Sequence, residues 1–316
     1  MILAVTLNPA LDVTHHVRHA DWDGVNRPHQ VLTRPGGKGL NVARVLRTLG
    51  ADVRAIGLAG GLDGQAVREG LAAAGVPATF TPIAGPTRRT FTVVDEAAGR
   101  VAAFNEPGPA VADDEYRLFL TLFGSALAGC SAAVLSGSVP PGVPASGYAA
   151  LTRTAAAAGV PVILDADGPA LRHALAAGPA VVKPNLAELE RAAGRDLRAG
   201  DEPDLAAVAD AARELTAAGA GAAVVSLGPR GLLAVTPDGA WLSAPAARAA
   251  GNPTGAGDAV VAGLALGLSL GSRWQERLRA CAALGAAAVV APAAGDISLD
   301  DYRRELDRVE LTAIGG

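Results

Sequence analysis

Cysteine, aromatic residues and lysine are scarce in this chain of 316 residues. Aromatic residues make up only 3% of the chain, so a core must be built from Ala, Val and Leu. The two cysteines, Cys130 and Cys281, lie far apart in apolar surroundings, which predicts reduced thiols and a cytoplasmic protein. The net charge of −4 includes no basic block, so we expect neither nucleic acid nor a membrane surface as a partner. No run of about 18 apolar residues is present, which argues against a membrane-spanning helix.

Short apolar runs alternate with Ala-, Leu- and Arg-rich stretches of helical pattern. The runs predict strands at residues 4–7, 53–57, 132–136, 160–165, 180–183, 222–227 and 232–236. The stretches predict helices at residues 40–49, 65–74, 113–127, 145–158, 169–176, 187–193 and 204–218. This alternation is typical of an α/β fold, with a mostly parallel sheet covered by helices on both faces. Ligands of such folds bind at the carboxyl ends of the strands.

Residues 12–33 and 87–107 depart from this pattern, because apolar and polar residues alternate in them. Val13, His15 and Val17 show the alternation in the first segment, and Phe91 and Val93 show it in the second. We predict that the two segments form a small separate sheet, inserted into a single domain of residues 1–316 as a lid over the site. Ordinary surface hairpins are the alternative.

The strongest motif is Gly255-Ala256-Gly257-Asp258, which precedes an apolar helical run. Small residues let backbone N–H groups converge at the start of a helix, where the partial positive charge suits a phosphoryl group. Asp258 would lie beside that group, placed to take a proton from an attacking hydroxyl. The turn is therefore a candidate catalytic site, and an N-capping aspartate on a glycine-rich loop is the alternative.

The only two lysines, beside 25 arginines, fall inside two further motifs. Lys38 lies in the glycine-rich residues 36–41, where Lys38 and Asn41 suit contacts with sugar hydroxyls; a plain helix-start loop is the alternative. That loop matches neither a Walker A motif nor a dinucleotide fingerprint. Lys183 begins residues 183–188, in which Asn185 and Glu188 are three apart and suit Mg²⁺ held through water. A helix-capping pair has the same spacing.

Three weaker signals complete the set. Ser138 follows a predicted strand in residues 136–142 and is a candidate contact to a substrate phosphate. Residues 226–231 follow another strand and are candidates to lie close to a nucleotide. Arg88, in the second lid segment, is a candidate phosphate ligand, and an unpaired surface arginine is the alternative.

These motifs, in this order, resemble those of the ribokinase-like (PfkB-type) carbohydrate kinases, within them the branch of 1-phosphofructokinases and tagatose-6-phosphate kinases. The resemblance covers nearly the whole chain and rests on residues 6–12, 25–27, 36–43, 87–88, 105–109, 136–142, 183–188, 225–231 and 255–258. It implies a three-layer α/β fold with a small β-sheet lid, often paired between two subunits. We therefore expect a homodimer joined through the lid.

The resemblance also implies a role for each matching residue. Asp258 would be the catalytic base, and Gly255, Ala256 and Gly257 would form the anion hole. The sugar phosphate would be bound by Asp12, Arg27, Gly36, Gly37, Lys38, Asn41, Arg88 and Ser138. ATP would be bound by Lys183, Asn185, Ser226, Gly228 and Gly231. Asn185 and Glu188 would organise Mg²⁺, mostly through water.

The chain departs from the pattern of that branch in two places, after Arg88 and just before the anion hole. Thr90 and Thr92 stand where the branch carries Asn and Lys, and the loss of that lysine removes one expected phosphate contact. The adjacent Arg89 is a candidate to replace it. Pro253, which precedes the anion hole, has no N–H group and a fixed φ angle.

The sequence therefore predicts an ATP-dependent sugar-phosphate kinase, with fructose 1-phosphate as the first candidate substrate and fructose 1,6-bisphosphate as its product. Tagatose 6-phosphate and fructose 6-phosphate are alternative substrates. A non-catalytic sugar-phosphate sensor is an alternative of another class, and the intact Asp258 argues against it. A dinucleotide-dependent enzyme is a third, and the missing fingerprint argues against that.

Overall fold

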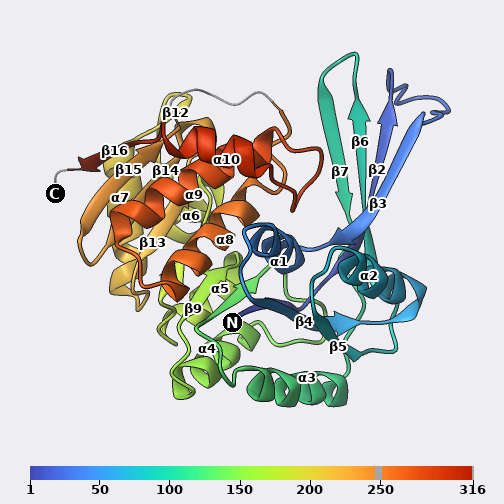
Figure 1. Cartoon of the computed structure of the whole chain (residues 1–316), viewed down its shortest axis with the longest axis horizontal. Coiled ribbons are helices and arrows are strands. Elements are labelled where there is room, and N and C mark those ends of the chain that lie inside the picture. The colour runs from blue at the N-terminus through green and yellow to red at the C-terminus, as the bar shows by residue number, and fades with distance from the viewer. Residues whose placement is uncertain (246–250, 315–316) are drawn as a thin grey trace.

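The computed structural model describes residues 1–245 and 251–314 of the chain. Ten strands form one large sheet, in the order β16-β15-β14-β13-β10-β9-β8-β1-β4-β5 (Figure 1). They are β1 (Ile2–Thr6), β4 (Val53–Ala59), β5 (Ala78–Pro82), β8 (Ala132–Ser136), β9 (Val162–Asp165), β10 (Val181–Val182), β13 (Ala223–Ser226), β14 (Leu232–Thr236), β15 (Gly239–Ala244) and β16 (Glu310–Ile314). Neighbours from β5 to β13 pair in parallel, whereas β13 to β16 pair antiparallel. The predicted strands are present, and β5, β15 and β16 are additional.

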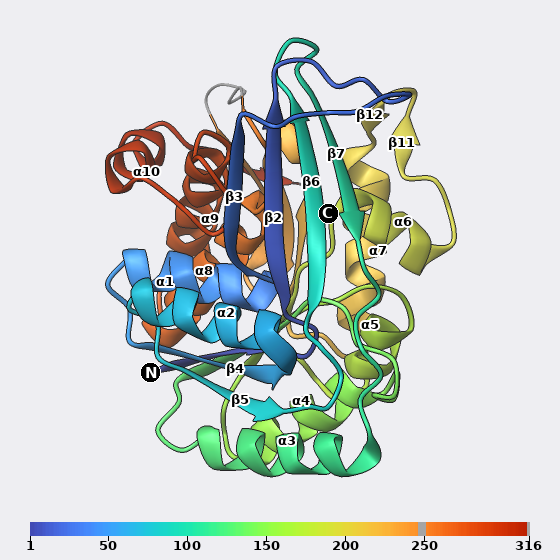
Figure 2. The ribbon, with the colours of Figure 1, turned by 90° about the vertical axis from the view of Figure 1, so that its right-hand side faces the viewer.

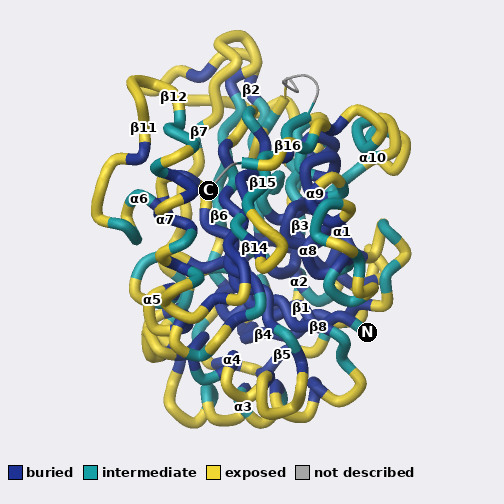
Figure 3. The backbone as a smooth tube through the Cα atoms, turned by 90° about the vertical axis from the view of Figure 1, so that its left-hand side faces the viewer, coloured by how far each residue is buried: buried dark blue, intermediate teal, exposed yellow. Residues whose placement is uncertain are grey.

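Helices cover both faces of the large sheet. One face packs against α1 (Lys38–Thr48), α2 (Gly61–Ala73), α8 (Ala256–Ser269), α9 (Trp274–Val289) and α10 (Leu299–Leu306). The other packs against α3 (Asp113–Ala126), α4 (Gly147–Ala157), α5 (Gly168–Leu175), α6 (Leu186–Ala193) and α7 (Leu205–Ala217). Figure 3 shows buried central strands between helices that are partly exposed. The predicted three-layer α/β fold is confirmed. Among the described residues, no helix is both long and apolar enough to cross a membrane.

Successive residues of β1 contribute side chains to the two hydrophobic cores on opposite faces of the large sheet. Leu3 and Val5 belong to the core beneath α3 to α7, whereas Ile2 and Ala4 belong to the core beneath α1, α2, α8 and α9. Side chains alternate across a strand, so a strand buried on both faces is apolar throughout. This is why the continuous apolar runs of the sequence predict the central strands.

A second, four-stranded sheet stands beside the body (Figures 1 and 2). Its order is β3-β2-β6-β7, with β3 (Gln30–Gly36), β2 (Ala10–Val17), β6 (Arg88–Asp95) and β7 (Arg100–Asn105). The central pair β2–β6 is parallel and the two outer pairs are antiparallel. The small separate sheet that the alternating segments predict is thus present, although β2 begins two residues earlier than residue 12 and β3 extends to Gly36. Two short strands, β11 (Arg198–Ala199) and β12 (Glu202–Pro203), pair apart from both sheets.

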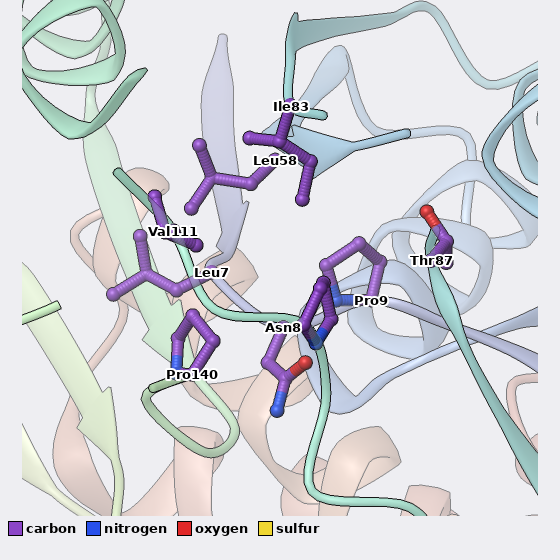
Figure 4. Close-up of a pocket in the computed structure, with 9 residues that line it drawn as sticks. Leu7, Asn8, Pro9, Leu58, Ile83, Thr87, Val111 and Pro140 are labelled. Carbon is purple, nitrogen blue, oxygen red and sulfur yellow. The ribbon is translucent and has the colours of Figure 1, made fainter. Parts of the chain in front are cut away.

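Apolar side chains pack around the segment that leads from β1 into the second sheet, as Figure 4 shows. Leu7, Leu58, Ile83 and Val111 surround a depression with no room for a water molecule. The amide of Asn8 points away from this apolar group and donates to the carbonyl of Pro107 (2.9 Å) and to Ser138 Oγ (3.0 Å). The packing therefore fixes the crossing from β1 into the second sheet.

Candidate active site

One cavity of about 1050 Å³ lies between the second sheet and the carboxyl edge of the large sheet. Parallel β1, β8, β9, β10 and β13 all end at that edge, so their following loops meet there. The predicted site residues that line it are Asp12, Gly37, Lys38, Asn41, Arg88, Ser138, Lys183, Asn185, Ser226, Gly228, Gly231, Gly255, Ala256, Gly257 and Asp258. Segments from almost the full length of the chain thus converge on one space.

Three predicted site residues do not line the cavity. Gly36 lies behind Asp12, and a Cβ atom on Gly36 would sit 2.0 Å from the carboxyl carbon of Asp12, so a side chain at position 36 would displace the Asp12 carboxylate. Arg27 is exposed in the connection between β2 and β3. Glu188 is buried just beneath the cavity wall, in the first turn of α6. The structure thus places Gly36 against Asp12, and Arg27 outside the cavity lining.

Asp258 lies in the first turn of α8 and lines the cavity. The N-cap of that helix is Gly255, so Asp258 is not the helix cap that the alternative interpretation requires. Its Oδ2 accepts a hydrogen bond of 2.8 Å from Asn41 Nδ2. Burial, and then the negative charge of Asp165, raise the pKa of Asp258 to about 7, against the opposing effects of Lys38 and Asn41. A carboxylate with such a pKa is suited to general base catalysis near neutral pH.

The turn before Asp258 leaves no room for a side chain at Gly255. Gly255 has a φ angle of +88°, and a Cβ atom there would lie 2.7 Å from the Cα of Ala294. A Cβ atom on Gly257 would lie 3.4 Å from Lys183 Nζ, so the ammonium group rests against the first turn of α8. The helix N-terminus and a lysine therefore face the cavity together, which makes this corner electropositive.

Asp165, at the end of β9, also lines the cavity, although no sequence motif indicates it. It is 1% exposed, and its carboxylate lies 3.3 Å from the ammonium groups of both Lys38 and Lys183. Ser136 Oγ donates a further hydrogen bond of 2.9 Å. Although burial opposes it, the two lysines lower the pKa of Asp165, which is therefore ionised. An isolated aspartate forms no motif. The sequence feature that could have indicated Asp165 as a site residue is its position at the carboxyl end of a predicted parallel strand.

The ammonium group of Lys38 points toward Asp165 and Glu188 instead of toward the second sheet. Its Nζ also lies 3.7 Å from Glu188 Oε1. Burial by itself would lower the pKa of Lys38, but the charges of Asp165 and Glu188 outweigh it and raise that pKa above its ordinary value. Lys38 is therefore a cation shared between two carboxylates, Asp165 and Glu188.

Asn185 and Glu188 form a reciprocal capping box at the start of α6. Asn185 Oδ1 accepts from the Glu188 N–H (2.9 Å), and Glu188 Oε2 accepts from the Asn185 N–H (2.8 Å). The capping pair, which the spacing left open, is thus what the chain forms. The free oxygen Glu188 Oε1 faces Lys38 together with Asp165.

The carboxylates of Asp165 and Glu188 suit a magnesium ion whose remaining ligands are phosphate oxygens and water. Within residues 1–245 and 251–314, no three His, Cys, Asp or Glu side chains gather closely enough to hold a metal ion alone. Mg²⁺ in phosphoryl-transfer sites takes one or two protein carboxylates and completes its shell with phosphate oxygens and water. Asp165 and Glu188 already converge on one cation, the ammonium of Lys38.

The side of the cavity that the second sheet forms carries polar groups, among them Asp12, Arg88 and Thr90. Asp12 accepts a hydrogen bond from Thr90, which opposes the rise in the pKa of Asp12 that burial causes. Arg88 donates to the carbonyl oxygens of Asn8 (3.2 Å) and Glu106 (3.0 Å). Within the part of the chain that the structure describes, the buried Asn41 Oδ1 has no hydrogen-bond partner. An acid, a guanidinium and a free acceptor together suit a polyhydroxyl anion.

Arg89 does not take the place of the missing lysine, contrary to the expectation from sequence. Its guanidinium makes two hydrogen bonds of 2.8 Å with Asp63 in α2, and it does not line the cavity. Alternation along β6 explains this, because Arg88, Thr90 and Thr92 line the cavity and the residue between them must face away.

Comparison with known proteins agrees with this geometry. The model of the pfkB family of carbohydrate kinases matches residues 6–301. The chain belongs to this family. The resemblance noted from the sequence motifs is thereby confirmed, and the protein is a carbohydrate kinase.

Curated and solved relatives cover nearly the full chain. The chain is 37% identical over 294 residues to 1-phosphofructokinase of Rhodobacter capsulatus, covering 92% of each protein. It is 35% identical to ATP-dependent 6-phosphofructokinase isozyme 2 of Mycobacterium tuberculosis, over 99% of this chain and 91% of the relative. Among solved structures it is similar to phosphofructokinase-2 of Escherichia coli in its tetrameric inhibited form, with a TM-score of 0.88, 33% identity and coverage of 97% and 98%.

Proposed function

We propose that this kinase transfers the γ-phosphate of ATP to the free primary hydroxyl of fructose 1-phosphate, giving fructose 1,6-bisphosphate and ADP. The observation that carries the proposal is one cavity lined by Asp258, by Arg88 and Asp12 of the second sheet, and by the loop from Ser226 to Gly231. The similarity to the 1-phosphofructokinase of Rhodobacter capsulatus supports this substrate. Fructose 6-phosphate is the second candidate, because the Mycobacterium tuberculosis relative is a 6-phosphofructokinase.

The chain's own residues divide the reaction between them. Asp258 takes the proton from the sugar hydroxyl as its oxygen attacks the γ-phosphorus and the bond to the ADP oxygen breaks. The N–H groups of residues 255–257 and the ammonium of Lys183 stabilise the charge on the phosphoryl group during transfer. Asp12 and Asn41 bind hydroxyls of the sugar, and Arg88 with Ser138 binds its phosphate. Arg27 stays a predicted phosphate contact.

ATP and Mg²⁺ are the implied co-substrate and metal. Bound Mg²⁺ would neutralise charge on the β- and γ-phosphates. Asp165 and Glu188 would hold it, mostly through water, with Asn185 placed beside them by the capping box. Ser226, Gly228 and Gly231 would lie along the nucleotide.

A coupled assay of ADP release across a panel of sugar phosphates tests the function. We expect fructose 1-phosphate to give the highest kcat/KM, ahead of fructose 6-phosphate and tagatose 6-phosphate. Replacing Arg88 by Met is expected to raise the KM for the sugar phosphate by about tenfold or more, because a charge-assisted contact is lost. ADP release that no sugar phosphate stimulates would contradict the proposal and favour a non-catalytic sensor.

The pH dependence of kcat/KM tests Asp258 as the base. Its pKa is raised to about 7, so below that pH the carboxyl is protonated and cannot accept a proton. We expect kcat/KM to rise about tenfold per pH unit below 7 and to level off above it. A profile that stays flat through pH 7 would show that another group, or no group, takes the proton.

We also propose that the second sheet is a lid that pairs with the lid of a second copy. Its outer face carries a row formed by Val13, Phe91 and Phe104, which are neighbours in register. Phe104 is 56% exposed and Val31 on the same face is 51% exposed. Such an exposed apolar face favours association. Light scattering should report twice the chain mass, and the Phe104→Glu variant should report a monomer; a monomeric wild-type protein would refute the pairing.

A further inference from the structure

Asp296, in the connection between α9 and α10, joins two arginines from different parts of the molecule. One carboxylate oxygen accepts a hydrogen bond from Arg34 in β3, and the other accepts one from Arg44 in α1. Arg34 lines the cavity and lies directly opposite Asp12 in the register of β2 and β3. The carboxylate therefore ties the lid to the body at the end where the sugar would bind.

The same short segment also touches the anion hole. Arg44 Nη1 donates to the carbonyl of Ala294 (3.1 Å), and Ala294 packs so closely on Gly255 that no side chain fits between them. Asn41, the hydrogen-bond partner of the catalytic base, is in contact with Gly295. Residues 294–296 thus pack on both elements that position the phosphoryl-transfer site, the start of α8 and the start of α1.

The charges make this contact depend on Asp296. Arg44 is only 8% exposed, so its guanidinium requires a partner. Burial, and then the charge of Arg34, lower the pKa of Arg44, while Asp296 opposes both. Without the carboxylate, two like charges would face each other between the lid and α1, and the lid strand would lose its tie to residues 294–296.

We propose that Asp296 is a positioning residue that couples the lid to the anion hole, so that a sugar phosphate bound under the lid strengthens ATP binding at α8. Coupling of this kind is reciprocal, so ATP strengthens sugar-phosphate binding by the same factor. The inference rests on the proposed function, because both substrates must bind in this cavity.

Titration calorimetry tests the coupling. The Kd of a non-hydrolysable ATP analogue with Mg²⁺ is measured with and without the fructose monophosphate that the wild-type enzyme phosphorylates best. We expect the sugar phosphate to tighten the wild-type Kd about fivefold or more. Asp296→Asn and Arg34→Gln are each expected to bring that ratio close to one, and the double variant to go no further, because both break one connection. Asp296→Glu should restore part of the ratio.

Arg89→Gln is the matched control. Arg89 and Asp63 also join the lid to the body, through two hydrogen bonds of 2.8 Å, but away from the cavity. This variant is expected to keep the wild-type ratio. A ratio of one in the wild type, an unchanged ratio in both Asp296→Asn and Arg34→Gln, or an equal loss in Arg89→Gln would each overturn the coupling. A purely structural role would lower Tm and both affinities while the ratio stayed the same, which also overturns it.

The two proposals fail in different ways. If the wild-type protein binds and phosphorylates no sugar phosphate, the proposed function fails and the coupling fails with it. If the wild type binds both ligands with a ratio above one and the variants keep that ratio, only the role of Asp296 fails.

Discussion

Replacing Asp258 with Asn is expected to lower kcat roughly 10²–10⁴-fold while both substrates still bind. Asparagine keeps the shape of the side chain and can still accept the hydrogen bond from Asn41, which is 2.8 Å long in the native chain. It cannot accept the proton of the sugar hydroxyl. ADP release measures kcat, and calorimetry with the ATP analogue and the sugar phosphate measures the two affinities.

Asp113→Asn is the control for this variant. Asp113 is also an acid in the first turn of a helix, α3, so the substitution has the same effect on the interaction with a helix dipole. Its side chain lies outside the cavity, and we expect kcat to stay within a few-fold of the wild type. An Asp258→Asn enzyme that turned over within tenfold of the wild type would remove Asp258 from the role of base.

The sequence predicts the central layers because burial on both faces leaves a strong signal in a strand. It does not predict β5, β15 and β16, since all three are only partly buried, mix polar with apolar residues and lie toward the two ends of the sheet. The second sheet is predicted because one of its faces is polar, so its strands alternate. The hydrophobic pattern of a strand reflects which of its faces are buried. Partly buried strands near the edges of a sheet therefore have the weakest pattern.

In the site, too, the sequence predicts residues that belong to a local motif and misses those whose partners are distant in the chain. Glycine turns such as residues 255–257 are local, because the backbone there must pass close to Ala294 or adopt a positive φ angle. Asp165 has no local motif, since its partners Lys38 and Ser136 come from other segments. Arg34 and Asp296 are 262 residues apart, and only the folded chain brings them together. Spacing also leaves two meanings for Asn185 and Glu188: the hydrogen bonds show the capping box, and the Mg²⁺ role stays a proposal.

Replacing Asp165 with Asn is expected to damage both stability and catalysis. Lys183 is almost fully buried and Asp165 is its ion-pair partner at 3.3 Å, so the substitution leaves a buried charge without its counter-charge. Loss of one member of a buried pair costs about 3–5 kcal/mol in the free energy of unfolding, measured by denaturant titration. Lys38 and Lys183 also lose the group that holds them at the cavity, so we expect kcat/KM to fall about 10²-fold or more.

Two further variants separate charge from packing in this expectation. Asp167→Asn makes the same change two residues later, at the exposed N-cap of α5, where Asp167 pairs with Arg191 at 2.6 Å. Asparagine caps a helix as well as aspartate and a surface ion pair contributes about 1 kcal/mol at most, so this variant should resemble the wild type. In Asp165→Asn/Lys183→Met the unpaired charge is gone, so stability should largely recover while activity stays low. If Asp165→Asn were as stable as Asp167→Asn, Lys183 would not depend on Asp165 for its burial.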